Sequence, residues 1–306
     1  MTIRTLALLL ILALTVPASA QTIYALRVAT GGSVPPLPSE PPRLPIFELI
    51  QITSIPSSQY VTSTTLVQLP PYPHIAAFDT VRQRAFLTVQ GDDHLYVADV
   101  QARSVTRSNV VTTGRTFAFD SAHETLYAGD GAGLLAVDLA GGTTTTIVAA
   151  DRTIVLCGLD SMRGRAFVSD PGGGELRYVD LNSRTLSSPL LTVDSSISVM
   201  AETEKDVLDI VYNNNHRNDI TRFDMTTWMP AAITNMALSG ISATTNALDT
   251  LSGHLFAIRG EDWNLLSLVN VDVRNGTVSG AYLAGDYAQV VVVQAAPPKR
   301  RATRAH

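Results

Sequence analysis

The chain has 306 residues, of which 45% are hydrophobic and 16% charged, and its formal net charge is -5. This composition supplies ample apolar surface for a folded core and excludes an extensively disordered chain. The acidic balance, with an isoelectric point of about 5.6, argues against a nucleic-acid-binding protein, which needs a basic surface.

Residues 1–20 have the features of an export signal. Arg4 is followed by the apolar run Leu6–Val16 and by the small residues that end at Ala20. Such a run is too short to cross a bilayer, which takes about 20 residues. We therefore expect a mature chain that begins at Gln21, is periplasmic or secreted, and has no transmembrane segment. The single cysteine, Cys157, excludes an internal disulfide and is expected to be a buried strand residue.

Two series of acidic residues recur along the rest of the chain. In the first, an aspartate follows a short aliphatic run and precedes turn-forming residues, as in "LYVADVQARSV" and "LRYVDLNSRTL". The second series lies upstream of the first, as in "IAAFDT" and "TFAFDS", and recurs every 40 to 47 residues. The first series is Asp99, Asp138, Asp180, Asp224 and Asp272; the second is Asp79, Asp120, Asp160, Glu202 and Asp249. A period of about 40 to 45 residues is typical of propeller blades with four strands.

Each repeat reads as four strands, a to d, separated by turns. In the third repeat these are residues 153–160, 163–170, 175–181 and 185–193, rich in β-branched and aromatic residues and bounded by Gly, Asp and Pro. The acidic residues are expected to begin the a-to-b and c-to-d hairpins, where a carboxylate accepts backbone N–H bonds and holds the turn. Glu202 departs from this pattern.

The two ends of the chain supply one further blade. Residues 22–30, 46–53 and 62–69 read as strands b, c and d without a strand a, and residues 288–294 read as a strand a without followers. Joining them closes a ring and removes exposed edges. We predict an all-β, six-bladed β-propeller of four-stranded blades in residues 21–296, with seven blades as the alternative, and a disordered basic tail at 297–306. The tail could make a weak electrostatic contact with an anionic envelope.

The alternation of "LYVAD" or "LYAGD" with "VDL" and a hairpin resembles the YVTN and NHL-type β-propeller repeats of exported bacterial proteins, over about residues 75–294. The resemblance implies a propeller fold. It leaves function open, because such propellers include enzymes, binding proteins and structural scaffolds.

Binding is expected on the face formed by the b-to-c loops, because these loops differ from repeat to repeat and variable loops on a rigid scaffold commonly bind ligands. The partner would be a protein or glycan of the envelope, or a small ligand. Gly, Asp and Asn in these loops could equally serve only as turn formers. Trp263 could contact a partner or pack between blades. The candidate ligand-binding residues are Asp92, Asp93, Asp130, Asp170, His216, Glu261, Asp262 and Trp263.

The alternative function is a hydrolytic enzyme. The gluconolactonase and senescence-marker group, which this chain resembles only in blade architecture, holds a divalent metal with carboxylates and asparagines at the channel. Here the inner strands offer His74, Arg115 and Asn246 as channel-lining residues, without carboxylates before the turns. The sequence therefore predicts no catalytic residue, metal site or cofactor. A purely structural envelope protein is the third possibility.

Overall fold

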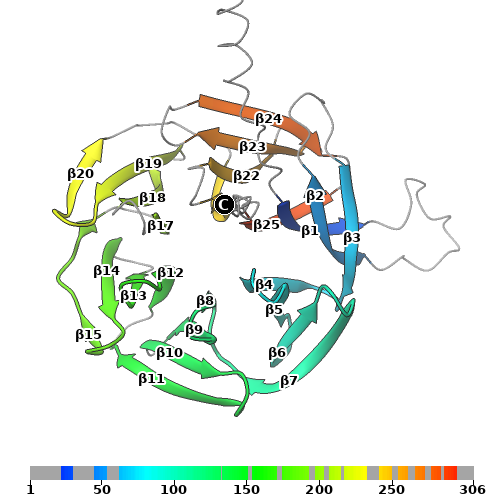
Figure 1. Cartoon of the computed structure of the whole chain (residues 1–306), viewed down its shortest axis with the longest axis horizontal. Coiled ribbons are helices and arrows are strands. Elements are labelled where there is room, and N and C mark those ends of the chain that lie inside the picture. Colours follow the sequence, from blue (N-terminus) through cyan, green and yellow to red (C-terminus); the bar gives the residue numbers. More distant parts are fainter. Residues whose placement is uncertain are drawn as a thin grey trace, which may run out of the picture.

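The described residues form 25 β-strands in six sheets that surround a central axis (Figure 1). The computed structural model describes residues 22–29, 45–53, 62–131, 133–150, 154–170, 174–192, 197–202, 207–214, 217–232, 241–249, 254–260, 266–272, 277–283 and 286–294. Within these ranges there is no helix long and apolar enough to cross a membrane. The predicted leader, 1–20, and the predicted tail, 297–306, lie outside them.

The first three blades follow one another along the chain, with strand a innermost. Blade one consists of β4 (Pro73–Asp79), β5 (Arg84–Val89), β6 (Asp92–Asp99) and β7 (Ser104–Val111). Blade two consists of β8 (Thr116–Asp120), β9 (Thr125–Asp130), β10 (Gly133–Asp138) and β11 (Thr143–Ala149). Blade three consists of β12 (Val155–Asp160), β13 (Arg165–Ser169), β14 (Glu175–Asp180), β15 (Thr185–Leu186) and β16 (Leu191–Thr192).

Two more blades and a composite blade complete the ring. Blade four consists of β17 (Ile197–Glu202), β18 (Val207–Asn214), β19 (Arg217–Asp224) and β20 (Met229–Ala232). Blade five consists of β21 (Ile241–Asp249), β22 (His254–Gly260), β23 (Leu266–Asp272) and β24 (Thr277–Leu283). The composite blade consists of β25 (Asp286–Gln294), β1 (Thr22–Ala29), β2 (Ile46–Thr53) and β3 (Thr62–Leu69), in that order from the axis.

The composite blade closes the ring as predicted. The last strand of the chain, β25, pairs antiparallel with β1, and Thr22 faces Gln294. The inner strands β4, β8, β12, β17, β21 and β25 each contact the next around the axis, and β25 contacts β4 (Figure 1). The chain is therefore a closed six-bladed propeller.

The hairpin turns confirm the predicted role of the aspartates wherever their side chains are described. Asp79 Oδ1 accepts hydrogen bonds from the backbone N–H groups of Val81 and Arg82, both at 3.1 Å. On the c-to-d side, Asp180 Oδ1 accepts from Asn182 at 3.0 Å and Ser183 at 2.8 Å. The fourth residue after the aspartate has a positive φ angle, and the non-glycine residues at this position are Gln83, Arg103, Glu124, Arg184 and Trp228.

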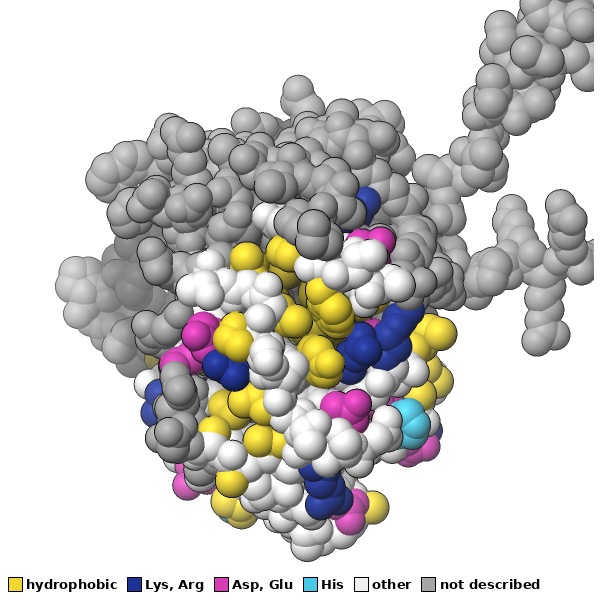
Figure 2. Space-filling view, turned by 90° about the vertical axis from the view of Figure 1, so that its left-hand side faces the viewer, with side chains coloured by type: hydrophobic (Ala, Val, Ile, Leu, Met, Phe, Trp, Pro, Cys, Tyr) yellow, Lys and Arg dark blue, Asp and Glu magenta, His cyan; other side chains and the backbone are white. Residues whose placement is uncertain are grey.

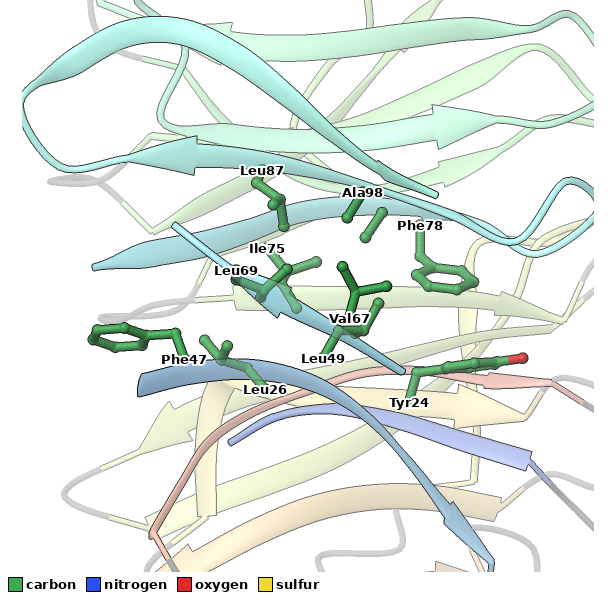
Figure 3. Close-up of a cluster of buried hydrophobic side chains, with 11 residues drawn as sticks. Tyr24, Leu26, Phe47, Leu49, Val67, Leu69, Ile75, Phe78, Leu87 and Ala98 are labelled. Carbon is green, nitrogen blue, oxygen red and sulfur yellow. The ribbon is translucent and has the colours of Figure 1, made fainter. Parts of the chain in front are cut away.

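The hydrophobic core lies between adjacent blades rather than on the axis. Figure 3 shows the cluster between the composite blade and blade one, with Phe47 near one end and the Tyr24 and Phe78 rings at the other. The Tyr24 and Phe78 rings are stacked, with their centroids 4.6 Å apart. Similar clusters join blades one and two, two and three, and three and four.

Two details differ from the sequence-based prediction. The outer strand of blade three, expected at 185–193, is interrupted around Pro189 and divided into β15 and β16, because proline cannot donate to the ladder. In blade four, the asparagine-rich stretch at 213–219, whose composition is typical of a loop, is mostly strand: Asn213 pairs with Asn218 and Asn214 with Arg217. Asp219 therefore belongs to β19.

Candidate functional site

The two faces of the disc are built differently. The a-to-b and c-to-d turns lie on one face, which we call the clamped face, and the b-to-c and d-to-a connections lie on the other, the b-to-c face. All five a-to-b connections have four residues, and so do the five c-to-d connections of blades one to five. The b-to-c connections range from two residues between β5 and β6 to sixteen between β1 and β2. The clamped face is therefore regular except for the eight-residue connection between β2 and β3 in the composite blade, and the b-to-c face is variable.

The fold brings four of the predicted binding residues to the b-to-c face. Asp92 and Asp93 begin β6, Asp130 ends β9, and Asp170 directly follows β13. They are contributed by blades one, two and three. The other four predicted binding residues, His216, Glu261, Asp262 and Trp263, lie outside the described residues.

Asp92 is the centre of a polar network on blade one. Its Oδ2 accepts hydrogen bonds from the Tyr96 hydroxyl at 2.7 Å and Arg107 Nε at 2.9 Å, and its Oδ1 accepts from Arg107 Nη2 at 3.1 Å. The His94 ring nitrogen Nδ1 lies 2.9 Å from Asp92 Oδ1 and 2.7 Å from Arg107 Nη2. The hydrogen bonds from Arg107, the His94 backbone and Tyr96 hold the pKa of Asp92 well below its usual range. Asp92 is thus an ionised carboxylate that already has an internal counter-ion.

The other acidic residues differ in accessibility. Asp93 is exposed, and its carbonyl oxygen accepts a hydrogen bond from Thr112 at 2.9 Å. Asp130 is only 9% exposed; its Oδ2 accepts from the Thr113 hydroxyl at 3.2 Å. The Asp130 carbonyl accepts from Ile154 N at 2.9 Å, which ties blade two to blade three. Asp93 is accessible to a partner, whereas Asp130 stabilises the scaffold.

His74, in β4, and Arg115, just before β8, lie at the b-to-c end of the inner strands of neighbouring blades, and both residues are exposed. Each lies five residues before a turn aspartate, Asp79 or Asp120. The surrounding protein partly desolvates the His74 imidazole and lowers its pKa below the ordinary value, although the residue is exposed. Asn246, the third predicted channel residue, lies in β21, and its side chain is outside the described part. In the described part of the chain, no three His, Cys, Asp or Glu side chains form a group that could hold a metal ion.

Charges on the clamped face are largely paired with one another. Asp79 is fully buried and forms ion pairs with Arg84 at 3.0 Å and Arg82 at 3.4 Å. Asp120 pairs with His123 at 2.7 Å, and Asp160 with Arg163 at 3.2 Å. On the outer edge of the disc at blades three and four, the described part shows acidic and basic side chains interspersed with hydrophobic ones, without a large patch of one charge (Figure 2).

Sequence reasoning missed an exposed aromatic residue on the b-to-c face. Tyr72, in the d-to-a connection before β4, is 55% exposed and has a φ angle of 51°. Its ring lies 5.4 Å from that of Phe47 in the composite blade. The prolines in "LPPYPH" are typical of a loop, but only the composite blade brings Phe47 beside Tyr72. Arg107 and Tyr96 were missed for a similar reason, since the register that pairs them cannot be read from the repeat alone.

Comparison with known proteins gives a likeness in fold. No family model matches the chain, and no curated protein matches it in sequence. The structure is similar to TolB from Acinetobacter baumannii, with a TM-score of 0.64 and 11% identity, over 90% of this chain and 67% of that one. It is similar to a chain of a nidogen/laminin complex, with a TM-score of 0.62 and 10% identity, over 90% of this chain and 98% of that one.

A third similar structure is regucalcin, a calcium-binding protein from Agrobacterium tumefaciens. The TM-score is 0.53 and the identity 14%, over 72% of this chain and 77% of that one. At these identities the likeness concerns the propeller architecture alone.

Proposed function

We propose that this protein is an exported propeller of the YVTN and NHL type that acts as a binding or scaffold module and recognises its partner on the b-to-c face. The observation that carries the proposal is the difference between the two faces. Turns of constant length held by aspartates serve geometry, whereas connections of two to sixteen residues on the opposite face vary as recognition loops do.

The position of the chain ends supports the same face. Thr22 and Gln294 pair with each other where the other blades have their a-to-b turn. Thr22 and Gln294 therefore lie at the clamped end of the composite blade, opposite the b-to-c face. The export signal in residues 1–20 supports a periplasmic or secreted location, where the partner is a protein, a glycan or a small ligand of the envelope.

A propeller can bind a partner in this way without catalysing a reaction. One similar structure is that of a nidogen/laminin complex, so the architecture occurs in a protein assembly. Acidic side chains on the b-to-c face, with Asp93 exposed, supply hydrogen-bond acceptors for such a partner.

The test is capture of envelope components by the immobilised mature protein, followed by cross-linking. One variant removes charge from the b-to-c face, with Asp93→Asn, Asp170→Asn, Glu261→Gln and Asp262→Asn. Its matched control changes exposed residues of the clamped face, Val81→Ser and Met162→Gln. We expect capture to fail only in the first variant, and the melting temperature of each variant is recorded so that a loss of capture can be separated from a loss of stability. Loss of capture in the control variant alone would mean that recognition takes place on the clamped face and that the proposal is wrong.

A further inference from the structure

We propose that Tyr72, together with the Asp92–Arg107 pair, forms a subsite for a neutral saccharide on the b-to-c face. The inference rests on the proposed binding function and names the chemistry of its ligand. It combines an exposed aromatic ring with a charge-balanced polar network on the same edge of blade one.

The positive φ angle of Tyr72 does not come from an aspartate-held hairpin turn. The other non-glycine residues with positive φ in the described part of the chain, such as Gln83 and Trp228, occupy the same position of an aspartate-held turn. Tyr72 lies outside these turns and precedes Pro73, where a left-handed conformation is unfavourable for a bulky residue. Its carbonyl oxygen accepts a hydrogen bond from Gln90 N at 3.2 Å, which fixes the loop. The result is an aromatic ring held at the surface.

Further apolar surface lies on the same face. Ile46, next to Phe47 at the start of β2, is 40% exposed, and Val111 at the end of β7 is 51% exposed. The Tyr72 ring contacts Phe47. A tyrosine with one accessible side offers the apolar C–H face of a sugar ring a stacking surface, while its hydroxyl remains able to hydrogen-bond.

The polar network retains an unused hydrogen-bonding group. Arg107 contacts Asp92 and His94 through Nε and Nη2, and its guanidinium also interacts with the Tyr96 hydroxyl, so the charged group is held at the surface by three partners. His94 uses Nδ1 in the network, so Nε2 remains as a donor or an acceptor according to the tautomer. The Arg107 side chain is 51% exposed and the His94 side chain 28% exposed, so both reach solvent.

The charge balance favours a neutral ligand. Asp92 and Arg107 cancel each other's charge, and neither anions nor cations gain a net attraction from the pair. A sugar hydroxyl can donate to the carboxylate and accept from the guanidinium, which a simple ion cannot do.

The spacing fits more than one sugar ring. The register places Pro73 opposite Val89, and Val89 opposite Asp92. Tyr72 and Asp92 are therefore about two strand spacings apart, roughly 10 Å. Tyr96, which shares its face of the sheet with Asp92, packs against the cluster between blade one and the composite blade, on the side where Tyr72 meets Phe47. A disaccharide stacked on Tyr72 reaches the network.

The experiment screens the mature protein on an array of neutral and uronic-acid-containing oligosaccharides, and titrates the best neutral one calorimetrically. We expect neutral binding that Tyr72→Ala weakens about tenfold. Tyr72→Phe should retain most of the affinity, and Val81→Ala on the clamped face should retain all of it. Arg107→Gln should also weaken binding, which keeps the inference testable if one variant fails to fold. Melting temperatures are recorded for every variant.

The inference is wrong if no neutral oligosaccharide binds or if only uronic-acid-containing ones do. It is also wrong if a neutral oligosaccharide binds with the same affinity to the parent protein, to Tyr72→Ala and to Arg107→Gln. If no saccharide binds but envelope capture still depends on the b-to-c carboxylates, the proposed function stands and only the ligand class is wrong. If capture depends on the clamped face, the proposed function itself fails.

Discussion

The buried turn aspartates should contribute far more to stability than their exposed counterparts, and Asp79 is the sharpest case. Its carboxylate is fully buried and accepts hydrogen bonds from two backbone N–H groups and two arginines. Removing an acceptor from buried donors costs about 1 to 3 kcal/mol, and breaking a buried ion pair costs about 3 to 5 kcal/mol. Arg82 and Arg84 are 36% and 28% exposed, so water compensates them in part. Buried Arg84 Nε has no partner in the described part of the chain.

We therefore expect Asp79→Ala to lower the free energy of unfolding by about 3 to 4 kcal/mol in urea titrations, with an unchanged slope against urea. Asp79→Asn keeps an oxygen that can accept the turn hydrogen bonds but loses the charge, so it should lower the free energy of unfolding by distinctly less than Asp79→Ala does. Asp99→Ala is the matched control, because Asp99 holds the same kind of turn on the outer strands with a hydrogen bond of 2.8 Å to Ala102 N in an exposed setting. Equal losses in Asp79→Ala and Asp99→Ala would refute the reasoning from burial.

The pH dependence of the same variants separates charge from geometry. Burial alone would raise the pKa of Asp79, but the hydrogen bond from Arg84 and those from the turn N–H groups outweigh it and lower the pKa below its ordinary value. A lowered folded-state pKa means that the charge contributes stability above the unfolded-state pKa of about 3.9, and that this contribution is lost as pH falls through the folded-state pKa. The difference in the free energy of unfolding between the parent protein and Asp79→Asn should begin to shrink below about pH 4 and should vanish once the pH is below the folded-state pKa. A difference that stays constant down to pH 2 would contradict the assigned role of the charge.

Three further predictions concern the scaffold and the maturation of the chain. Deleting all residues after Asp286 removes most of β25, so cooperative thermal unfolding followed by circular dichroism should be lost; a truncated chain as stable as the parent would contradict the closure of the ring. Cys157 lies in β12 as predicted but is only partly buried; desolvation raises the pKa of its thiol to about 12, so a disulfide reagent at pH 8 should modify the native protein slowly and the denatured protein fast; fast native modification would contradict this. Mass spectrometry of the exported protein should find its N-terminus at Gln21, and retention of residues 1–20 would rule out cleavage.

The fold was predictable because the repeat carries its own turn chemistry. An aspartate that accepts N–H bonds, followed four residues later by a residue with positive φ, marks both hairpins of blades one to three and the c-to-d hairpin of blade four, so the positions of the strands follow from these markers. Closure was predictable because residues 22–69 supplied strands b, c and d and residues 288–294 the missing strand a. The strand positions and the closure of the ring therefore follow from turn-forming residues and from the number of strands in each repeat.

The site was predictable only in part, because side chains on different blades meet through register and bulges. The irregularities in β6 and β7 place Arg107 opposite Tyr96 and bring its guanidinium to Asp92. Nothing in the repeat pattern indicates that Asp92 is neutralised while the adjacent Asp93 is exposed. Likewise, Tyr72 meets Phe47 only because the N-terminal strands complete a blade beside blade one.

The composite blade also explains why the regular turns and the variable loops are on opposite faces. In blades one to five a four-residue a-to-b turn joins the two inner strands, and in the composite blade the chain itself is interrupted at that position, between Gln294 and Thr22. Strand pairing between β25 and β1, over seven residue pairs, must therefore replace an aspartate-held turn. A ring closed in this way requires constant geometry on the clamped face, since each blade must present its inner strand at the same height to its neighbour. The b-to-c connections lie at the other end of the strands and are free of this requirement. Sequence variation can accumulate there without opening the ring, which is the property that a recognition surface needs.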